Sequence, residues 1–243
     1  MPEPAMMEER RVAVVTGANR GLGFETSRQL GARGLKVIVT SRDGLEGKAS
    51  ADKLHSEGLD VAYQPLDVLR AGSIARLHDF VADSFGRLDV LVNNAAIFPE
   101  YHGEHATVLQ CETELLRENL EVNSFAPLRL IQVLLPLMRR NGYGRIVNLS
   151  TGYARFSALR ETYPAYRLSK VALNALTRMI AAETADENIL VNCVDPGWTR
   201  TRMGGDRAPA TPEDSAAAIV EAALLPDDGP SGRFLHHGEA VDW

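Results

Sequence analysis

The sequence is poor in cysteine and in net positive charge, and both shortages narrow the possible functions. Its 243 residues include two cysteines, Cys111 and Cys193, too few for a disulfide framework. Cys193 lies in an apolar run, where a thiol behaves as a small hydrophobic side chain. The formal net charge is −6 at pH 7. Because a nucleic-acid backbone is bound by clustered Lys and Arg, we expect no nucleic-acid partner.

Long apolar runs are absent as well. No segment reaches the roughly 20 apolar residues of a membrane span, and Met1 to Arg10 carry three Glu and two Pro in place of a secretory signal. These features predict a cytoplasmic protein with no membrane partner. Since no linker or internal repeat divides the remainder, we expect residues 1–10 to form a flexible segment and residues 11–243 a single domain.

Short runs rich in Val, Ile and Leu alternate with longer amphipathic stretches, as in repeated βα units. Because the runs are continuously apolar, they predict strands covered on both faces. The expected fold class is α/β, with a doubly wound, mostly parallel, seven-stranded sheet and helices on both faces. The expected strands are Val12–Thr16, Val37–Thr40, Val61–Leu66, Val90–Asn93, Ile146–Leu149, Leu190–Val194 and Arg233–Leu235. The expected helices cover residues 22–33, 45–57, 72–85, 113–140, 164–185 and 212–225.

Prolines and glycines predict two local irregularities. Pro127 and Pro136 fall inside the expected helix 113–140 and should bend or interrupt it, because proline removes a backbone hydrogen bond. The segment Thr199 to Thr211 contains Gly204-Gly205 and is bounded by prolines, which is typical of a mobile loop that closes over a site.

A glycine-rich loop follows the first expected strand and leads directly into the first helix. It consists of Gly17, Asn19, Arg20, Gly21, Leu22 and Gly23 around Ala18. Glycines at such a turn let backbone amides approach a pyrophosphate, which then lies at the positive N-terminus of the helix. Glycines also serve ordinary tight turns. The position between a strand and a helix favours dinucleotide binding over a turn without function.

The spacing of these glycines, three intervening residues and then one, resembles that of the short-chain dehydrogenase/reductase family. Further matches follow in family order: Asp67, Asn93-Asn94-Ala95, Asn123, Ser150-Thr151, Tyr166 with Lys170, and Pro196-Gly197. The chain looks like the carbonyl reductase group in Thr40-Ser41-Arg42-Asp43, Pro196 to Thr201, Leu224-Leu225-Pro226 and the terminal Trp243. The resemblance implies a Rossmann fold. It also implies that the cofactor contacts, beyond the glycine loop, are Asp67, Val68, Asn94, Ala95, Ser150, Tyr166, Lys170, Pro196, Gly197, Thr199 and Thr201.

The residues after the second expected strand bear on the choice of nicotinamide cofactor. NAD is usually selected by an acidic side chain at this position, whereas the 2′-phosphate of NADP(H) needs cationic donors. Here Arg42 follows the small Ser41, and Arg20 lies in the glycine loop. The two arginines predict NADP(H) as the cofactor. The alternative is that both are solvated and that Asp43 binds the ribose.

Tyr166 and Lys170 are four residues apart and therefore share one face of the expected helix. A free phenol has a pKa near 10, so a nearby ammonium would ease proton exchange at neutral pH. The resemblance implies that Tyr166 transfers the proton and that Lys170 also binds the nicotinamide ribose. It further implies that Asn123 holds a water that connects Lys170 to solvent. Without the resemblance, Asn123 would be taken for a polar helix residue that bonds locally.

A hydroxyl residue after the fifth strand completes the expected catalytic group. The family pattern has two serines and uses the second, which aligns with Thr151. Threonine keeps the hydroxyl donor but is stiffer. Thr151 is therefore expected to orient the carbonyl, and Ser150 is the alternative.

The expected function is hydride transfer between NADPH and a ketone, aldehyde or quinone, with Tyr166 as proton donor. The alternatives are an NAD-dependent secondary alcohol dehydrogenase and a non-catalytic dinucleotide sensor. Candidates for an apolar pocket wall are Phe98, Tyr101, Tyr153, Phe156, Trp198 and Met203, which favour an apolar or aromatic small-molecule substrate.

Several histidines and arginines are not assigned to a site. His102 and His105, like His236-His237, lack a metal-binding pattern, and we expect no metal. Arg139-Arg140 and Arg145 are expected to form a solvated helix end.

The fourteen residues between Thr151 and Tyr166 are too few to add a helix that covers the neighbouring helices. Those helices, 113–140 and 164–185, carry many apolar residues. We therefore expect a homodimer or homotetramer.

Overall fold

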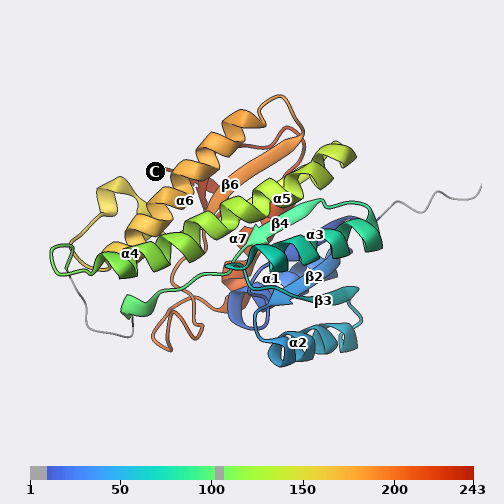
Figure 1. Cartoon of the computed structure of the whole chain (residues 1–243), viewed down its shortest axis with the longest axis horizontal. Helices are drawn as coiled ribbons and strands as arrows, with labels where there is room; N and C mark the ends of the chain where they lie inside the picture. The colour runs from blue at the N-terminus through green and yellow to red at the C-terminus, as the bar shows by residue number, and fades with distance from the viewer. Residues whose placement is uncertain (1–9, 102–106) are drawn as a thin grey trace, which may run out of the picture.

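A single sheet forms the centre of the molecule (Figure 1). The computed structural model describes residues 10–101 and 107–243, so the expected flexible segment lies outside it except for Arg10. In this part of the chain the sheet has eight strands in the order β3-β2-β1-β4-β5-β6-β7-β8. Their bounds are β1 Val12–Val15, β2 Lys36–Ser41, β3 Val61–Pro65, β4 Val90–Asn93, β5 Gly144–Leu149, β6 Ile189–Asp195, β7 Phe234–His236 and β8 Glu239–Val241.

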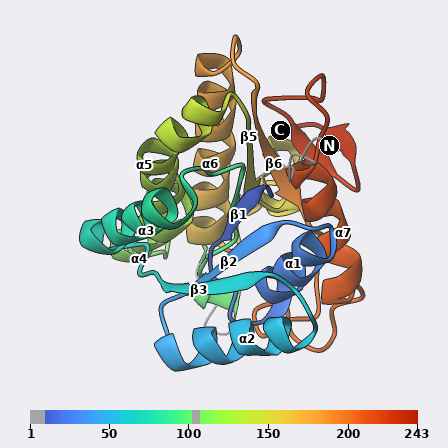
Figure 2. The same cartoon turned by 90° about the vertical axis from the view of Figure 1, so that its right-hand side faces the viewer.

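Helices cover both faces of the sheet (Figure 2). One face carries α1 Gly21–Ala32, α2 Gly44–Ser56 and α7 Pro212–Ala223, and the other carries α3 Ala71–Phe85, α4 Thr113–Leu120, α5 Ala126–Asn141 and α6 Pro164–Glu183. Val12 and Val14 of β1 join the core on the α3 and α5 face, whereas Ala13 and Val15 join the opposite core. The continuous apolar run of this strand is therefore buried on both sides, as the sequence predicts.

The order of the strands determines where a site can form. The chain winds from β1 to β3 in one direction and then returns to place β4 on the other side of β1. In such sheets, ligands bind where the winding reverses, beyond the carboxyl ends of the strands. Because β1 to β7 are parallel, the loops that follow them meet at that edge. The predicted doubly wound α/β fold is confirmed.

Two expectations about the sheet were wrong. The eighth strand, Glu239–Val241, pairs antiparallel with β7, but it has three residues and no apolar run that would reveal it. Arg145 is not solvated: it lies in β5 with its side chain fully buried. Its guanidinium donates to Leu225 O at 2.8 Å and to Asp227 Oδ1 at 2.8 Å, and these partners replace water.

The expected helix 113–140 is divided into three parts. A π-helical turn, η2 Glu121–Phe125, separates α4 from α5, and Pro127 lies in the first turn of α5, where its missing N–H is tolerated. Pro136 lies within α5. An interruption is thus found directly before Pro127, whereas α5 continues through Pro136 and does not end there as one form of the prediction required. Within the described residues, no helix combines the length and apolar composition needed to cross a membrane.

Candidate active site

The glycine-rich loop after β1 is held by the polar residues after β4. Gly17 and Gly21 have φ of +63° and +53°, values that favour glycine. A Cβ on Gly23 would lie 2.5 Å from Asn94 Nδ2, so a side chain does not fit there. Asn94 Nδ2 donates to Thr16 O at 2.7 Å and to Gly17 O at 3.0 Å. The loop therefore passes close to Asn94, which braces it.

The start of α1 can accept an anion. Its first turn contains no acidic residue, and the side chain of Arg20 at the N-cap makes no capping hydrogen bond. The N–H groups of a helix start are then available to a phosphate. A Cβ built on Gly21 would lie 3.3 Å from Thr201 Cγ2, so the segment after β6 reaches this loop. The open backbone and the close approach of these loops fit the pyrophosphate of a dinucleotide.

Of the residues expected to select between NAD(H) and NADP(H), Arg20 and Asp43 are bonded to other protein groups. Arg20 Nη1 donates to Glu46 Oε2 at 2.8 Å, and Asn19 Nδ2 donates to the same oxygen at 2.5 Å. Arg42 is exposed at the end of β2. Asp43 Oδ1 accepts two N–H groups from the first turn of α2, at 2.9 and 3.0 Å. The Asp43 carboxylate therefore acts as a helix cap.

Tyr166 and Lys170 lie on the buried face of α6. Tyr166 is 8% exposed and Lys170 2% exposed, and the ammonium Nζ lies 5.9 Å from the centre of the phenol ring. Burial raises the pKa of Tyr166, and the charge of Asp195 adds to the effect. Burial lowers the pKa of Lys170 to about 8. Lys170 Nζ donates to Leu149 O at 2.8 Å, which fixes the ammonium at the end of β5.

The segment after β4 positions Tyr166 in two ways. The ring of Phe98 stacks on that of Tyr166, with centres 3.9 Å apart and planes 12° from parallel. Glu100, which is 3% exposed, accepts Ala165 N at 3.2 Å and Tyr166 N at 2.8 Å. Pro164 has no N–H, so Glu100 satisfies two of the free donors at the start of α6. The carboxylate is also favourably placed in the field of the helix.

Asn123 lies in the π-helical turn and ties it to the segment after β4. Its Oδ1 accepts Ile97 N at 2.9 Å, and its Nδ2 donates to Ile97 O at 2.9 Å. Nδ2 also donates to Ser169 Oγ, 3.0 Å away on α6. The side chain therefore joins the π-helical turn to the segment after β4 and to α6. π-Helical turns are rare and are often found at functional sites.

The two hydroxyl residues after β5 have different surroundings. Ser150 is 4% exposed and donates its hydroxyl proton to Asn174 Oδ1 at 2.6 Å. Thr151 is partly exposed, and its Oγ1 accepts Tyr153 N at 3.3 Å at the start of the short helix η3 Gly152–Ala154. The hydroxyl proton of Thr151 is not used in that contact, because the oxygen is the acceptor.

The remaining expected residues lie along the same edge. Asp67 Oδ1 accepts Leu69 N at 3.1 Å in the turn after β3, and Val68 packs against the core. Gly197 after β6 has φ of +75°, and Thr199 Oγ1 lies 2.6 Å from Ser215 Oγ of α7. No contact joins Arg42 or Asp67 to Tyr166 or Lys170 among the hydrogen bonds and ion pairs of the described residues.

Phe98, which stacks on Tyr166, belongs to a cluster of aromatic side chains. Phe98 also contacts Tyr101 and Tyr163, with ring centres 5.3 and 5.1 Å away. The loop after β6 is tied to this cluster, because Tyr101 Oη and Trp198 Nε1 both donate to Gly204 O, at 3.0 and 2.8 Å. Tyr153, Phe156 and Trp198 are exposed. His102 and His105 lie outside the described residues.

Three site residues were not identified from the sequence. Glu100 is bonded to residues more than 60 positions away, and no local pattern marks such an acid. Glu46 reaches Arg20 across 26 positions, which also leaves no local signal. Asn174 could have been found, because it lies one helical turn beyond Lys170 on the same face.

Comparison with known proteins agrees with this geometry. The sequence model of the family described as short chain dehydrogenase matches residues 11–211. Carbonyl reductase (NADPH) 1 of Sus scrofa is 33% identical over 98% of this chain and 96% of its own length. Salutaridine reductase of Papaver somniferum is 33% identical over 98% of this chain and 99% of its own. The crystal structure of an NADPH-bound carbonyl reductase from chicken fatty liver has a TM-score of 0.85 at 28% identity and covers 97% of this chain and all of that one. The chain therefore belongs to the short-chain dehydrogenase family, and within it resembles the carbonyl reductases.

Proposed function

We propose that this protein uses NADPH to reduce a ketone, aldehyde or quinone to the alcohol, with Tyr166 as the proton donor. The observation that carries the proposal is the pair of Tyr166 and Lys170, buried together on α6 at the edge where the glycine loop ends. Relatives over nearly the whole chain are named as NADPH carbonyl reductases. Intact proton-transfer groups favour an enzyme over a dinucleotide sensor.

The side chains divide the chemistry among them. The hydride would come from NADPH when it is bound. Tyr166 gives its proton to the carbonyl oxygen, and because burial raises the pKa of the phenol, the group is protonated before the reaction. Lys170 holds a positive charge close to the ring and favours the phenolate that is left behind. Thr151 donates a hydrogen bond that orients the carbonyl oxygen and keeps its own proton, whereas the Ser150 hydroxyl is already bonded to Asn174.

The preference for NADP(H) rests on charge. Arg20 and Arg42 are the cations near the end of β2, and a 2′-phosphate is bound by such donors. Asp43 is the acid that could bind a ribose hydroxyl in their place, but its Oδ1 caps α2. The glycine loop, Asn94 and the segment from Pro196 to Thr201 complete the proposed binding surface.

The proposed substrate is apolar or aromatic. Phe98 stacks on Tyr166 and contacts Tyr101 and Tyr163, and the rings of Tyr153, Phe156 and Trp198 are exposed. Aromatic walls with a few placed polar groups favour flat apolar ligands over small charged ones.

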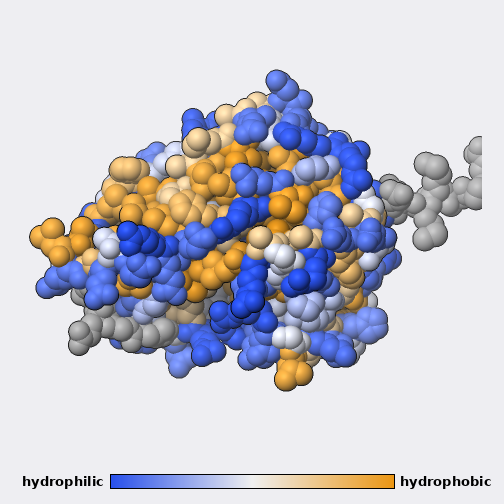
Figure 3. Space-filling view, viewed as in Figure 1, coloured by the Kyte–Doolittle hydropathy of each residue, from blue (hydrophilic) through white to orange (hydrophobic). Residues whose placement is uncertain are grey.

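A homodimer is proposed on the face formed by α4, α5 and α6, where apolar side chains lie among charged ones (Figure 3). Leu168 and Met179 of α6 are 47% and 67% exposed and lie on the same side of the helix, eleven residues apart. Phe125 of the neighbouring π-helical turn is 43% exposed. A two-fold partner would bury this strip.

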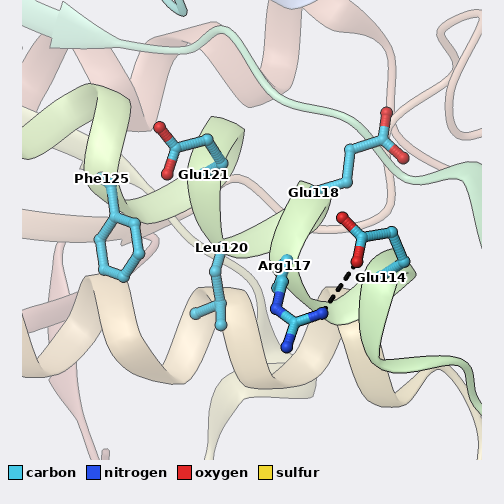
Figure 4. Close-up of a pocket in the computed structure, with 6 residues that line it drawn as sticks. All are labelled: Glu114, Arg117, Glu118, Leu120, Glu121 and Phe125. Carbon is cyan, nitrogen blue, oxygen red and sulfur yellow. Dashed lines mark hydrogen bonds and ion pairs between the residues drawn. The ribbon is translucent and has the colours of Figure 1, made fainter.

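The same face is hollowed next to α4. Figure 4 shows Leu120 and Phe125 on one side of the helix and Glu121 on the other, with the ion pair of Arg117 and Glu114 at the end away from Phe125. The hollow encloses about 430 Å³ and is lined by Glu114, Arg117, Glu118, Leu120, Glu121 and Phe125. None of these residues belongs to the proposed catalytic group.

The test is a panel of carbonyl compounds followed by NADPH absorbance, with Tyr166→Phe as the variant. The phenylalanine ring preserves the packing on Phe98 but cannot donate a proton, so turnover should fall by at least about 100-fold while the Kd of NADPH changes little. Near-normal rates in the variant would refute the role of Tyr166. Tight NADPH binding with no activity toward any carbonyl would favour the sensor, and faster alcohol oxidation with NAD would favour the NAD-dependent dehydrogenase.

A further inference from the structure

Glu46 forms an ion pair with Arg20, one of the two cations that would bind the 2′-phosphate of NADP(H). Its Oε2 accepts Arg20 Nη1 at 2.8 Å and Asn19 Nδ2 at 2.5 Å, so one carboxylate oxygen engages two residues of the glycine loop. The ion pair is open to water, with both side chains 52% exposed. It links the loop after β1 to the first turn of α2, directly beside the residues that follow β2.

The carboxylate is held at this place by the fold. Glu46 lies in the first turn of α2, where the helix N-terminus favours an acid. Asp43 caps the same turn and accepts Glu46 N at 3.0 Å, which fixes the backbone of Glu46 relative to β2. A second tie comes from Ser50, whose hydroxyl donates to Asn19 O at 2.6 Å and holds the glycine loop against α2. The pairing with Arg20 therefore follows from the packing of α2.

We propose that Glu46 is a specificity-determining residue that competes with the 2′-phosphate of NADP(H) for Arg20. In the free protein the carboxylate pairs with the guanidinium, and cofactor binding has to replace this partner with the phosphate. The negative charge of Glu46 then remains beside a second anion. Glu46 therefore weakens NADP(H) binding but leaves NAD(H), which has a hydroxyl at that position, almost unaffected. This inference rests on the proposed function, because it requires the phosphate to be bound near Arg20.

The test compares Glu46→Gln with the parent by isothermal titration with NADP+ and with NAD+. Glutamine has the same shape and can still accept from Asn19, but it has no charge. An exposed ion pair and one nearby like charge are each small effects, so we expect the Kd of NADP+ to fall by about three- to tenfold. The Kd of NAD+ should change by less than about twofold. The gain should shrink at about 1 M salt, where charges are screened within a few ångströms.

Glu57→Gln is the matched control. Glu57 lies at the other end of α2 and pairs with Arg28 at 2.8 Å, so its replacement removes the same charge from the same helix far from the glycine loop. It should leave the Kd of NADP+ unchanged. An equal gain in both variants would mean that overall charge is responsible and would overturn the proposal.

Arg20→Ala separates the two hypotheses. If Glu46 acts through Arg20, adding Glu46→Gln to Arg20→Ala should bring clearly less than the gain seen in the parent. Unchanged or weaker NADP+ binding in Glu46→Gln, in a parent that prefers NADP+ to NAD+, would refute the inference and leave the proposed function standing. A parent without that preference would instead refute the proposed cofactor.

Discussion

The buried ammonium of Lys170 should destabilise the folded protein, and this can be measured without any substrate. Burial lowers the pKa of Lys170 from 10.5 to about 8. At about 1.4 kcal/mol for each pH unit between these values, keeping the charge buried costs on the order of 3 kcal/mol at neutral pH. Methionine has a similar length without the charge, so Lys170→Met removes this cost. The hydrogen bond to Leu149 O is lost as well, which costs about 1 kcal/mol.

The expected balance is a variant about 2 kcal/mol more stable than the parent at pH 7. The difference should depend on pH with a definite sign. Below pH 8 the lysine is protonated in both the folded and unfolded states, so the full cost is present. Between pH 8 and 10.5 the unfolded state binds more protons, and the parent gains stability as the pH rises. Near pH 10.5 the advantage of methionine should be lost, and the missing hydrogen bond should make the variant slightly less stable.

The assay is urea unfolding of the cofactor-free protein at pH 7 and pH 10, with parent and variant compared at each pH. Lys48→Met, on the exposed surface of α2, is the control and should show no such pH-dependent difference. A variant that is less stable at pH 7, or a difference that is the same at both pH values, would refute the reasoning. The stabilised variant should have lost most of its activity, because the proposed mechanism uses the charge near Tyr166 for proton transfer.

Three further predictions concern the hydroxyl group, the cap of α6 and the assembly. Thr151→Ser should keep most of the turnover, and Thr151→Ala should lower kcat/KM by about 100-fold. A larger loss in Ser150→Ala, in the same NADPH assay, would assign the orientation of the carbonyl to Ser150 instead. Glu100→Ala should lower the unfolding free energy by about 2 kcal/mol and reduce kcat. Glu100→Gln should retain more of the stability and of kcat, and equal losses in the two variants would contradict a capping role. Sedimentation at micromolar concentration should give twice the monomer mass of 26.5 kDa, and Met179→Glu should return it to 26.5 kDa; a parent at the monomer mass would exclude the proposed dimer.

Patterns within short stretches of sequence were enough to predict most of the helices and strands. The alternation of apolar runs and amphipathic stretches predicted β1 to β6 and the covering helices within a few residues, because burial on both faces leaves a pattern within a single strand. The glycine loop was recognisable for a similar reason, since Gly17 and Gly21 adopt backbone conformations that other residues avoid. Tyr166 and Lys170 were assigned to one helix face by their spacing alone.

The tertiary structure decided which groups became partners. Arg145 resembles a solvated cation in the sequence, but Asp227, 82 positions away, and the carbonyl of Leu225 allow it to be buried. Glu100 reaches the start of α6, and Glu46 reaches Arg20, only because the loops after β1, β2 and β4 meet at one edge of the sheet. Hydrogen bonds and ion pairs between distant residues leave no periodic pattern, because each depends on two positions that come together only when the whole chain has folded. The sequence by itself therefore determined the elements and placed Tyr166 and Lys170 on one helix face, whereas the packing of those elements decided how the two side chains are held and which charges surround them.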